Sequence, residues 1–212
     1  MAVHVAPTPA TATVPVASEE LLERAAAVLR AQNIEVLIVD TGAEARDAVL
    51  ERIPAGSEVH SGKSRTLEDI GVFEALHAPG AYDPIRPKLM SMDRATQGRE
   101  MRKLGAVPDT IAGSVNAITA DGALVAASAT GNNLAAYAGG AGRVILVVGA
   151  QKFVADIPAA LDRIRDIVFP YENERVNAML GVDTKIEKVL VLFGEWVSGR
   201  TTVILVREPV GV

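Results

Sequence analysis

A first group of residues able to bind a ligand lies in a short stretch, Val59-His60-Ser61-Gly62-Lys63-Ser64-Arg65-Thr66. Its Gly-Lys-Ser triplet is shared with the P-loop, G-x-x-x-x-G-K-[ST], in which the backbone N–H groups of a glycine-rich turn surround a phosphate. That pattern needs a glycine where Ser57 stands, and Gly56 lies too early. The residues before Gly62 also read as a short strand and not as a flexible loop. The spacing therefore argues against a nucleotide-binding P-loop.

The same stretch still offers the groups of an anion site. A strand that runs into a helix presents free backbone N–H groups and the positive end of the helix dipole at the turn. The side chains that could add hydrogen bonds or charge there are Ser61, Lys63, Ser64, Arg65 and Thr66, with Gly62 in the turn. A carboxylate, a phosphate or a CoA pyrophosphate would each fit. The alternative is a capped turn with solvated cations, since helix caps are common in any fold.

A second group of candidates lies in the β-prone segment 113–125. Asn116 and Thr119 offer hydrogen bonds to a ligand, and Asp121 could act as a general base. However, an Asp-Gly pair between two β-prone runs is a strong hairpin signal, and an aspartate before glycine is more often there for the turn. Both interpretations stay open for Asp121.

Two further candidates follow later in the chain. The small-residue loop at Gly131 and Asn132 opens a helix and could hold an anion, although Thr130 or Asn132 could simply cap that helix. Lys152 comes just after a strand that ends at Gly149, where it could pair with a substrate carboxylate or phosphate. The alternative for Lys152 is a solvated loop lysine.

The charge and the aromatic content argue against a nucleic-acid partner. The 212 residues have a formal net charge of −5, and the 21 lysines and arginines are dispersed along the chain. Aromatic residues make up 4% of the chain, too few for the stacking platforms that bind single strands. The hydrophobic content of 49% over this length supports one substantial core.

The chain contains no cysteine, which excludes disulfides, thiol nucleophiles and iron–sulfur ligation by its own residues. The histidines, at positions 4, 60 and 77, show no metal-ligand spacing. We therefore expect no metal and no cofactor. No apolar run approaches the ~20 residues that span a bilayer, so we expect no membrane association.

The N-terminal segment is rich in alanine, proline and threonine, and it lacks the basic and continuous apolar regions of a signal peptide. We predict a disordered leader over residues 1–17, a cytoplasmic protein, and a single α/β domain over residues 18–212.

Hydrophobic periodicity predicts that helices alternate with strands through this domain. The predicted helices begin at Ser18 and at Thr66 as N-caps and cover 43–52, 90–104 and 156–167; the predicted strands cover 34–39, 57–60, 144–148, 188–193 and 201–206. The proline-containing segment 79–87 is predicted to be a loop. Near-continuous apolar strands are typical of a sheet that is covered on both faces. The predicted fold class is three-layer α/β, with a mostly parallel sheet, helices on both faces and one β-hairpin insertion.

Two stretches, Thr66-Leu67-Glu68-Asp69-Ile70-Gly71 and Gly113-Ser114-Val115-Asn116-Ala117-Ile118-Thr119, resemble the LUD-domain family, which is named for lactate utilisation. Later features strengthen the resemblance: Gly131-Asn132 after the hairpin, Val147-Val148-Gly149 followed by Lys152, and the closing run from Arg200 to Glu208. The order and separation of these motifs make the match specific, and it covers residues 18–212.

The resemblance implies a fold related to the group of phosphosugar isomerases, CoA-transferases and formyltetrahydrofolate cyclo-ligases. It also implies an association with iron–sulfur proteins that oxidise lactate to pyruvate. Relatives with the GSVNAIT signature often carry a cysteine cluster in the segment that here runs from Leu180 to Trp196, and this chain has none. That departure argues against a redox role for this chain itself.

The leading functional hypothesis is a protein that binds a small anionic metabolite in support of lactate or related organic-acid metabolism. By fold analogy, the enzyme alternative is an isomerase or a CoA/acyl-transferase. CoA transfer would need a carboxylate nucleophile, and Glu68 is the candidate, although it could equally compensate the helix dipole. A third alternative is a non-catalytic subunit that docks onto iron–sulfur partners. The two apolar strands near the C-terminus fit either a dimer edge or a covered part of the core.

Overall fold

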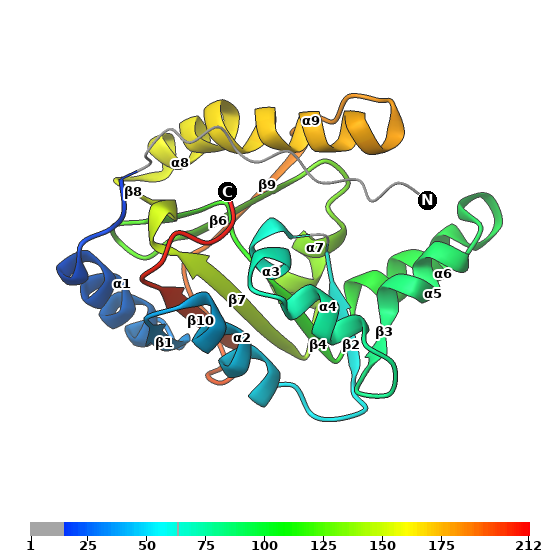
Figure 1. Ribbon diagram of the computed structural model, residues 1–212, viewed down its shortest axis with the longest axis horizontal. Coiled ribbons are helices and arrows are strands. Elements are labelled where there is room, and N and C mark those ends of the chain that lie inside the picture. Colours follow the sequence, from blue (N-terminus) through cyan, green and yellow to red (C-terminus); the bar gives the residue numbers. More distant parts are fainter. Residues whose placement is uncertain (1–14, 63) are drawn as a thin grey trace.

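The apolar runs of the sequence form a six-stranded sheet in the computed structural model, which describes residues 15–62 and 64–212. The strand order is β1 (Glu35–Val39), β10 (Thr201–Val206), β7 (Arg143–Gly149), β4 (Thr110–Gly113), β2 (Glu58–Ser61) and β3 (Asp83–Pro84). All of the pairings in this sheet are parallel. The predicted α/β class with a mostly parallel sheet is therefore confirmed (Figure 1).

The central strands are buried on both faces, which explains their lack of polar alternation. In β7, Val144, Leu146 and Val148 face one hydrophobic core, while Ile145 and Val147 face another. Every residue of β10 is buried as well. The prediction left open whether the strand at 201–206 is a dimer edge or part of the core, and its position between β1 and β7 places it in the core.

Helices cover one face of this sheet. They are α2 (Gly42–Glu51), α3 (Arg65–Asp69) and α4 (Val72–His77), whose buried side chains pack on Ile145 and Val147. The prediction that Thr66 caps the helix after β2 is wrong. Ser64 holds the N-cap position, and Thr66 lies inside α3, where its hydroxyl is used in a tertiary contact described below.

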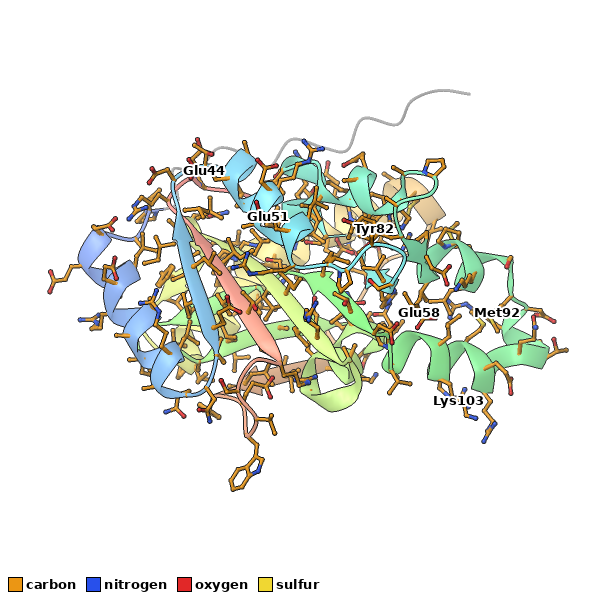
Figure 2. The ribbon with its side chains drawn as sticks, turned by 90° about the horizontal axis from the view of Figure 1, so that it is seen from below. Glu44, Glu51, Glu58, Tyr82, Met92 and Lys103 are labelled. Atoms are coloured by element: carbon orange, nitrogen blue, oxygen red, sulfur yellow. The ribbon has the colours of Figure 1, made fainter. Side chains whose placement is uncertain are left out.

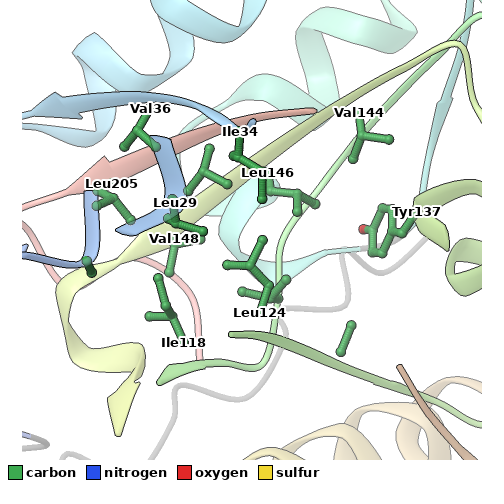
Figure 3. Close-up of a cluster of buried hydrophobic side chains, with 14 of the residues drawn as sticks. Leu29, Ile34, Val36, Ile118, Leu124, Tyr137, Val144, Leu146, Val148 and Leu205 are labelled. Carbon is green, nitrogen blue, oxygen red and sulfur yellow. The ribbon is translucent and has the colours of Figure 1, made fainter. Parts of the chain in front are cut away.

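The other face is covered by α1 (Glu19–Ala31) together with a second sheet of four strands, in the order β8 (Phe153–Val154), β5 (Ala117–Thr119), β6 (Leu124–Ser128) and β9 (Lys188–Leu192). Figure 3 shows the core between them, where Leu29 of α1 and Ile118 and Leu124 of the small sheet meet the β7 side chains. The predicted hairpin is present as β5 and β6. The sequence did not predict that β8 and β9 extend this hairpin into a sheet of its own.

The outer face of the small sheet packs against a long helical segment. It consists of α8 (Ile157–Arg163), a π-helical turn η3 (Ile164–Val168) and α9 (Phe169–Leu180), and Ala160 and Ile164 lie against Ala117 and Val125. The predicted helix at 156–167 and the short helix predicted to follow Pro170 are therefore parts of one continuous segment. Pro170 does not end the segment; it comes just after the π-helical turn η3, where the backbone hydrogen-bond pattern is already altered.

The segment after α4 forms an arm beyond β3, made of α5 (Ile85–Ser91) and α6 (Arg94–Ala106). Figure 2 shows Met92 and Lys103 on this arm, far from Glu44 at the opposite end of the molecule. The predicted loop 79–87 is correct only in part, because β3 and the first turn of α5 fall within it and Pro87 is tolerated in that turn.

The N-terminal leader predicted over 1–17 lies mostly outside the described residues, which begin at residue 15. Ala17 packs on the main core and donates its N–H to the carbonyl of Ala150 at 3.0 Å. Within the described ranges no helix is long and apolar enough to cross a membrane.

Candidate functional site

Three neighbouring strands of the large sheet bring the candidate residues together. The carboxyl ends of β2, β4 and β7 lead into the segments 62–66, 114–116 and 150–152, the last of which is the short 3-10 helix η2 (Ala150–Lys152). Because these strands are parallel and adjacent, the segments meet at one edge of the sheet, where ligands bind in this class of fold. All three segments line a cavity of about 450 Å³.

Lys152 reaches into this edge from η2. Its Nζ donates to Thr66 Oγ1 at 2.8 Å, to Ser114 Oγ at 2.9 Å and to the carbonyl oxygen of Val115 at 3.3 Å. These acceptors come from the other two strand ends, so one ammonium group ties all three together. The side chain lines the cavity, yet the residue is only 2% exposed.

Lysine is rarely buried to this extent without a carboxylate partner. The three acceptors of Lys152 are neutral, and none of the ion pairs in the described part of the chain includes it. Burial lowers the pKa of Lys152 to about 7; the positive charge of Arg163 lowers this pKa further, and the negative charge of Asp69 opposes the shift. A cation in such a place is stabilised by a bound anion, which supplies the missing charge.

The cavity as a whole is cationic, although the chain carries a net negative charge. The charged side chains lining it, within the described ranges, are Arg65, Arg86, Lys152, Arg175 and Lys185 on the positive side and Glu172 on the negative side. Glu172 is engaged by Arg175, with N–O distances of 2.5 and 2.8 Å. The Nη1 atom of Arg175 is buried and has no hydrogen-bond partner among the described residues.

Arg65 shows how the rim of the cavity is ordered. It lies in the first turn of α3, where its Nε donates to Asp69 at 2.6 Å and its Nη1 donates to the hydroxyl of Tyr171 at 3.3 Å. Tyr171 belongs to α9, so this contact joins the turn after β2 to the long helical segment on the other side of the cavity.

The far wall of the cavity is largely apolar and comes from the helical segment and from the loop that follows it. Its members are Ile164, Val168, Phe169, Met179, Leu180 and Ile186. A ligand with a charged end near Lys152 and an uncharged portion against this wall would match both surfaces.

The predicted site residues divide into two groups. Those that line the cavity are Gly62, Ser64, Thr66, Asn116, Asn132 and Lys152. Lys63 lies outside the described residues. Ser61 is the last residue of β2 and is 2% exposed, and its Oγ has no hydrogen-bond partner among the described residues; it does not line the cavity.

The remaining predicted residues do not line the cavity. Thr119 accepts a hydrogen bond from the N–H of Ala123 at 2.9 Å and donates to Asp121, so both side chains hold the β5–β6 turn. Gly131 caps α7 (Asn132–Ala135) with a φ of 82°, a conformation that favours glycine. Glu68 lies in α3, outside the described lining.

Ser114, Arg175 and Tyr171 line the cavity but were not singled out as site residues from the sequence. Ser114 could have been found, because it directly follows a buried strand, as Gly62 does. The local sequence holds no signal for Arg175 or Tyr171. Their helix lies beside the cavity because the helical segment packs on the small sheet, which the sequence did not predict.

His60, in β2, gives the fold a dependence on pH. Both of its ring nitrogens are buried without a hydrogen-bond partner among the described residues, and burial, with smaller contributions from the positive charges of Arg86 and His77, lowers its pKa to about 4. Between about pH 6.5 and 4 the unfolded chain therefore binds a proton at this histidine that the folded chain does not.

The free energy of unfolding should consequently fall as the pH falls through this window, by at most about 1.4 kcal/mol per pH unit from this group. Denaturant titrations at intervals from pH 7 to 4 will measure the slope. His60→Leu should remove the contribution of this residue. An unchanged slope in that variant would show that His60 is protonated normally in the folded protein.

The described residues contain no group of three or more histidine, aspartate or glutamate side chains able to hold a metal ion.

Comparisons with known proteins found a matching family and a similar solved structure. A family model described as the LUD domain matches residues 22–206. The fold is similar to that of a DUF162 family protein from Deinococcus radiodurans, with a TM-score of 0.54 and 13% identity over 91% of this chain and 99% of that chain. A weaker similarity, to eIF2B delta from Chaetomium thermophilum, has a TM-score of 0.34 and 20% identity over 63% of this chain and 54% of that chain. No curated protein sequence matches the chain significantly.

Proposed function

This chain belongs to the LUD-domain family, and on that premise we propose that its cavity binds a small anionic metabolite through Lys152. The observation that carries the proposal is a buried ammonium group that reaches the cavity with only neutral oxygen acceptors around it. Removing such a charge from water is costly, and an anionic ligand beside it offsets that cost.

Three classes of ligand suit the cavity: a carboxylic acid, a phosphorylated compound and a CoA-type compound. Its volume of about 450 Å³ lies within the usual range for small-molecule sites, roughly 300–1,000 Å³. The cationic rim at Arg65 and Arg175 would meet a second negative group, and the apolar wall would meet an uncharged portion. Family membership favours a role in lactate or related organic-acid utilisation.

A thermal-shift screen tests the proposal. The panel should pair each anion with an uncharged analogue of similar shape: lactate and pyruvate with their amides, phosphosugars with the free sugars, and CoA with pantetheine. A ligand that binds only the folded chain raises the melting temperature by mass action, so the anions should raise it and their neutral analogues should not. The shift should also shrink as salt is added. Equal shifts within every pair, or none at all, would contradict an anion site.

A second candidate is a subunit that docks onto another protein, as the family resemblance implies for iron–sulfur partners. The loop after β9 supports it, because Phe193, Trp196 and Val197 are 66%, 96% and 63% exposed. Exposed apolar side chains gathered on one loop are typical of interaction sites. Co-purification of the native chain with iron–sulfur proteins encoded nearby, lost in Trp196→Ser and kept in Met90→Ser on the α5–α6 arm, would favour this candidate.

A further inference from the structure

We propose that Ser114 and Lys152 form a nucleophile and general-base pair, and that the cavity therefore transfers or hydrolyses the acyl group of an anionic ester or thioester. This inference rests on the proposed anion-binding cavity, whose rim at Arg65 and Arg175 would hold the charged part of the substrate while the reacting carbonyl group lies beside Ser114 and Lys152. It assigns a reaction, which anion binding alone does not require.

The geometry of the pair is that of an activated hydroxyl. Ser114 Oγ and Lys152 Nζ are 2.9 Å apart, within hydrogen-bond distance, and both residues line the cavity. Ser114 directly follows β4 and Lys152 closes η2 just after β7, so rigid neighbouring strands hold both groups. Serine is a weak nucleophile until an adjacent base takes its proton, and lysine serves as that base in known Ser-Lys arrangements.

The hydrogen bonds around the pair are compatible with a neutral amine. A neutral lysine has two N–H donors and one lone pair; Val115 O and Thr66 Oγ1 can accept the donors, which leaves the lone pair for Ser114. Ser114 Oγ also lies 2.7 Å from the carbonyl of Val147, which can accept the serine proton when the lysine is charged. The serine proton thus has one acceptor for each protonation state of Lys152.

Two neighbours hold the serine in position. Thr66 Oγ1 lies 3.3 Å from Ser114 Oγ, so its hydroxyl can donate to the serine while it accepts from Lys152. On the other side, Tyr137 lies tightly against the residue before the serine, since a Cβ at Gly113 would come within 1.8 Å of the Tyr137 hydroxyl. Gly113 is therefore required where β4 delivers Ser114 to the cavity.

Burial makes the amine available near neutral pH. The pKa of Lys152 is lowered to about 7, chiefly by burial, with Arg163 of α8 lowering it further and Asp69 of α3 raising it. A substantial fraction of the lysine is therefore neutral in the free protein, as a general base must be.

The reaction balances without a further reagent. Ser114 Oγ attacks the carbonyl carbon, and its proton passes to Lys152 Nζ. The carbon–oxygen or carbon–sulfur bond of the leaving group then breaks, and the ammonium returns the proton to that group, leaving an acyl-serine. Water, deprotonated by Lys152 in the same way, attacks the acyl-serine. The bond between the carbonyl carbon and Ser114 Oγ then breaks, the ammonium returns its proton to Oγ, and a carboxylic acid is released. The cationic rim holds the charged part of the substrate, and the apolar wall of η3 and α9 holds the uncharged part.

The experiment uses a fluorophosphonate, which labels activated serines, and an anionic ester, 4-nitrophenyl hemisuccinate, with neutral 4-nitrophenyl butyrate as its control. We expect labelling at Ser114 by mass spectrometry and a faster release of nitrophenol from the anionic ester. Both rates should rise with pH through about 7, as Lys152 becomes neutral. Ser114→Ala should reduce labelling at least 100-fold and Lys152→Met should reduce it similarly, while Ser91→Ala, exposed on α5, should match the native chain.

Ser114→Cys is a second variant, which tests whether lost labelling in Ser114→Ala comes only from misfolding. It should stay folded, and iodoacetamide should alkylate its cysteine with the pH dependence that the fluorophosphonate shows on the native chain. Equal labelling of the native and Ser114→Ala chains, or labelling only at other residues, would overturn the pair. If anions raise the melting temperature of the native chain but neither probe reacts, this inference fails and the proposed function stands. If neither anions nor probes interact, both fail.

Discussion

Replacing Lys152 with methionine should weaken the binding of an anionic ligand by at least about 100-fold. The replacement removes one partner of a buried pair of opposite charges, and such a loss costs about 2–5 kcal/mol of binding free energy. Methionine retains most of the length and the apolar character of the side chain, so the neighbours Thr66 and Ser114 keep their surroundings. Isothermal titration with the tightest-binding anion of the screen measures the loss. Lys103→Met is the matched control, since Lys103 lies exposed on α6 and outside the cavity lining.

The association constant for an anionic ligand should also fall as the pH rises. Because the pKa of Lys152 in the free protein is about 7, raising the pH above that value removes the charge that attracts the ligand. The association constant should fall by up to about tenfold per pH unit until the pKa of the complex is passed. Burial lowers the pKa of Arg163 to about 10, so Arg163 keeps most of its charge over this range. Affinity that stays flat from pH 7 to 9, or a Lys152→Met chain that binds as tightly as the native one, would contradict the assignment.

The stability of the native fold should change with pH in the opposite direction. Between about pH 7 and 10.4 the unfolded chain carries a proton on Lys152 that the folded chain has lost, so the free energy of unfolding rises with pH. The contribution is at most about 1.4 kcal/mol per pH unit. Lys152→Met lacks it and should be at least as stable as the native chain at pH 7, because an apolar side chain carries no desolvation cost.

Urea titrations of both chains at intervals from pH 6.5 to 9.5 will measure this difference. The window stops below pH 10 because burial raises the pKa of Tyr137, so ionisation of that tyrosine in the unfolded chain lowers stability at higher pH. If the free energies of unfolding of the native and Lys152→Met chains change with pH in parallel, Lys152 stays protonated in the folded chain. The predicted fall of binding with pH would then need another cause.

Much of the fold could be predicted from local sequence. The hairpin at Asp121-Gly122 was found because its turn is encoded by neighbouring residues. Three residues, 120–122, lie between the paired Thr119 and Ala123, and the glycine takes the positive φ that the turn needs. The parallel sheet was found because buried strands such as β7 and β10 are continuous apolar runs. The strand β9 was also found, but its antiparallel partner β6 lies far away in the sequence, so nothing local placed it in a second sheet.

The candidate site was predicted less evenly, for the same reason. Lys152 was predicted to lie at the ligand-binding edge of the sheet because it follows a strand, although a lone lysine in a loop is usually solvated. Asn116 was expected to contact a ligand, and it does line the cavity, but its Oδ1 already accepts the N–H of Ala127 at 2.6 Å and so also pins β6. Thr66 was taken for a helix cap, although its hydroxyl is needed 2.8 Å from Lys152.

Local sequence was enough to predict most of the strands and helices, the hairpin turn, the family resemblance and the exclusion of cysteine chemistry. These follow from periodicity, turn residues and composition, which act over a few neighbouring positions. The three-dimensional structure was needed to show that Lys152 is buried, that Ser114 and Thr66 are its partners, and that Arg175 of α9 lines the cavity. The contacts of Lys152 depend on the strand order β2-β4-β7, and the place of Arg175 depends on the packing of its helical segment on the small sheet. Both are set by long-range pairings that compete for one shared core.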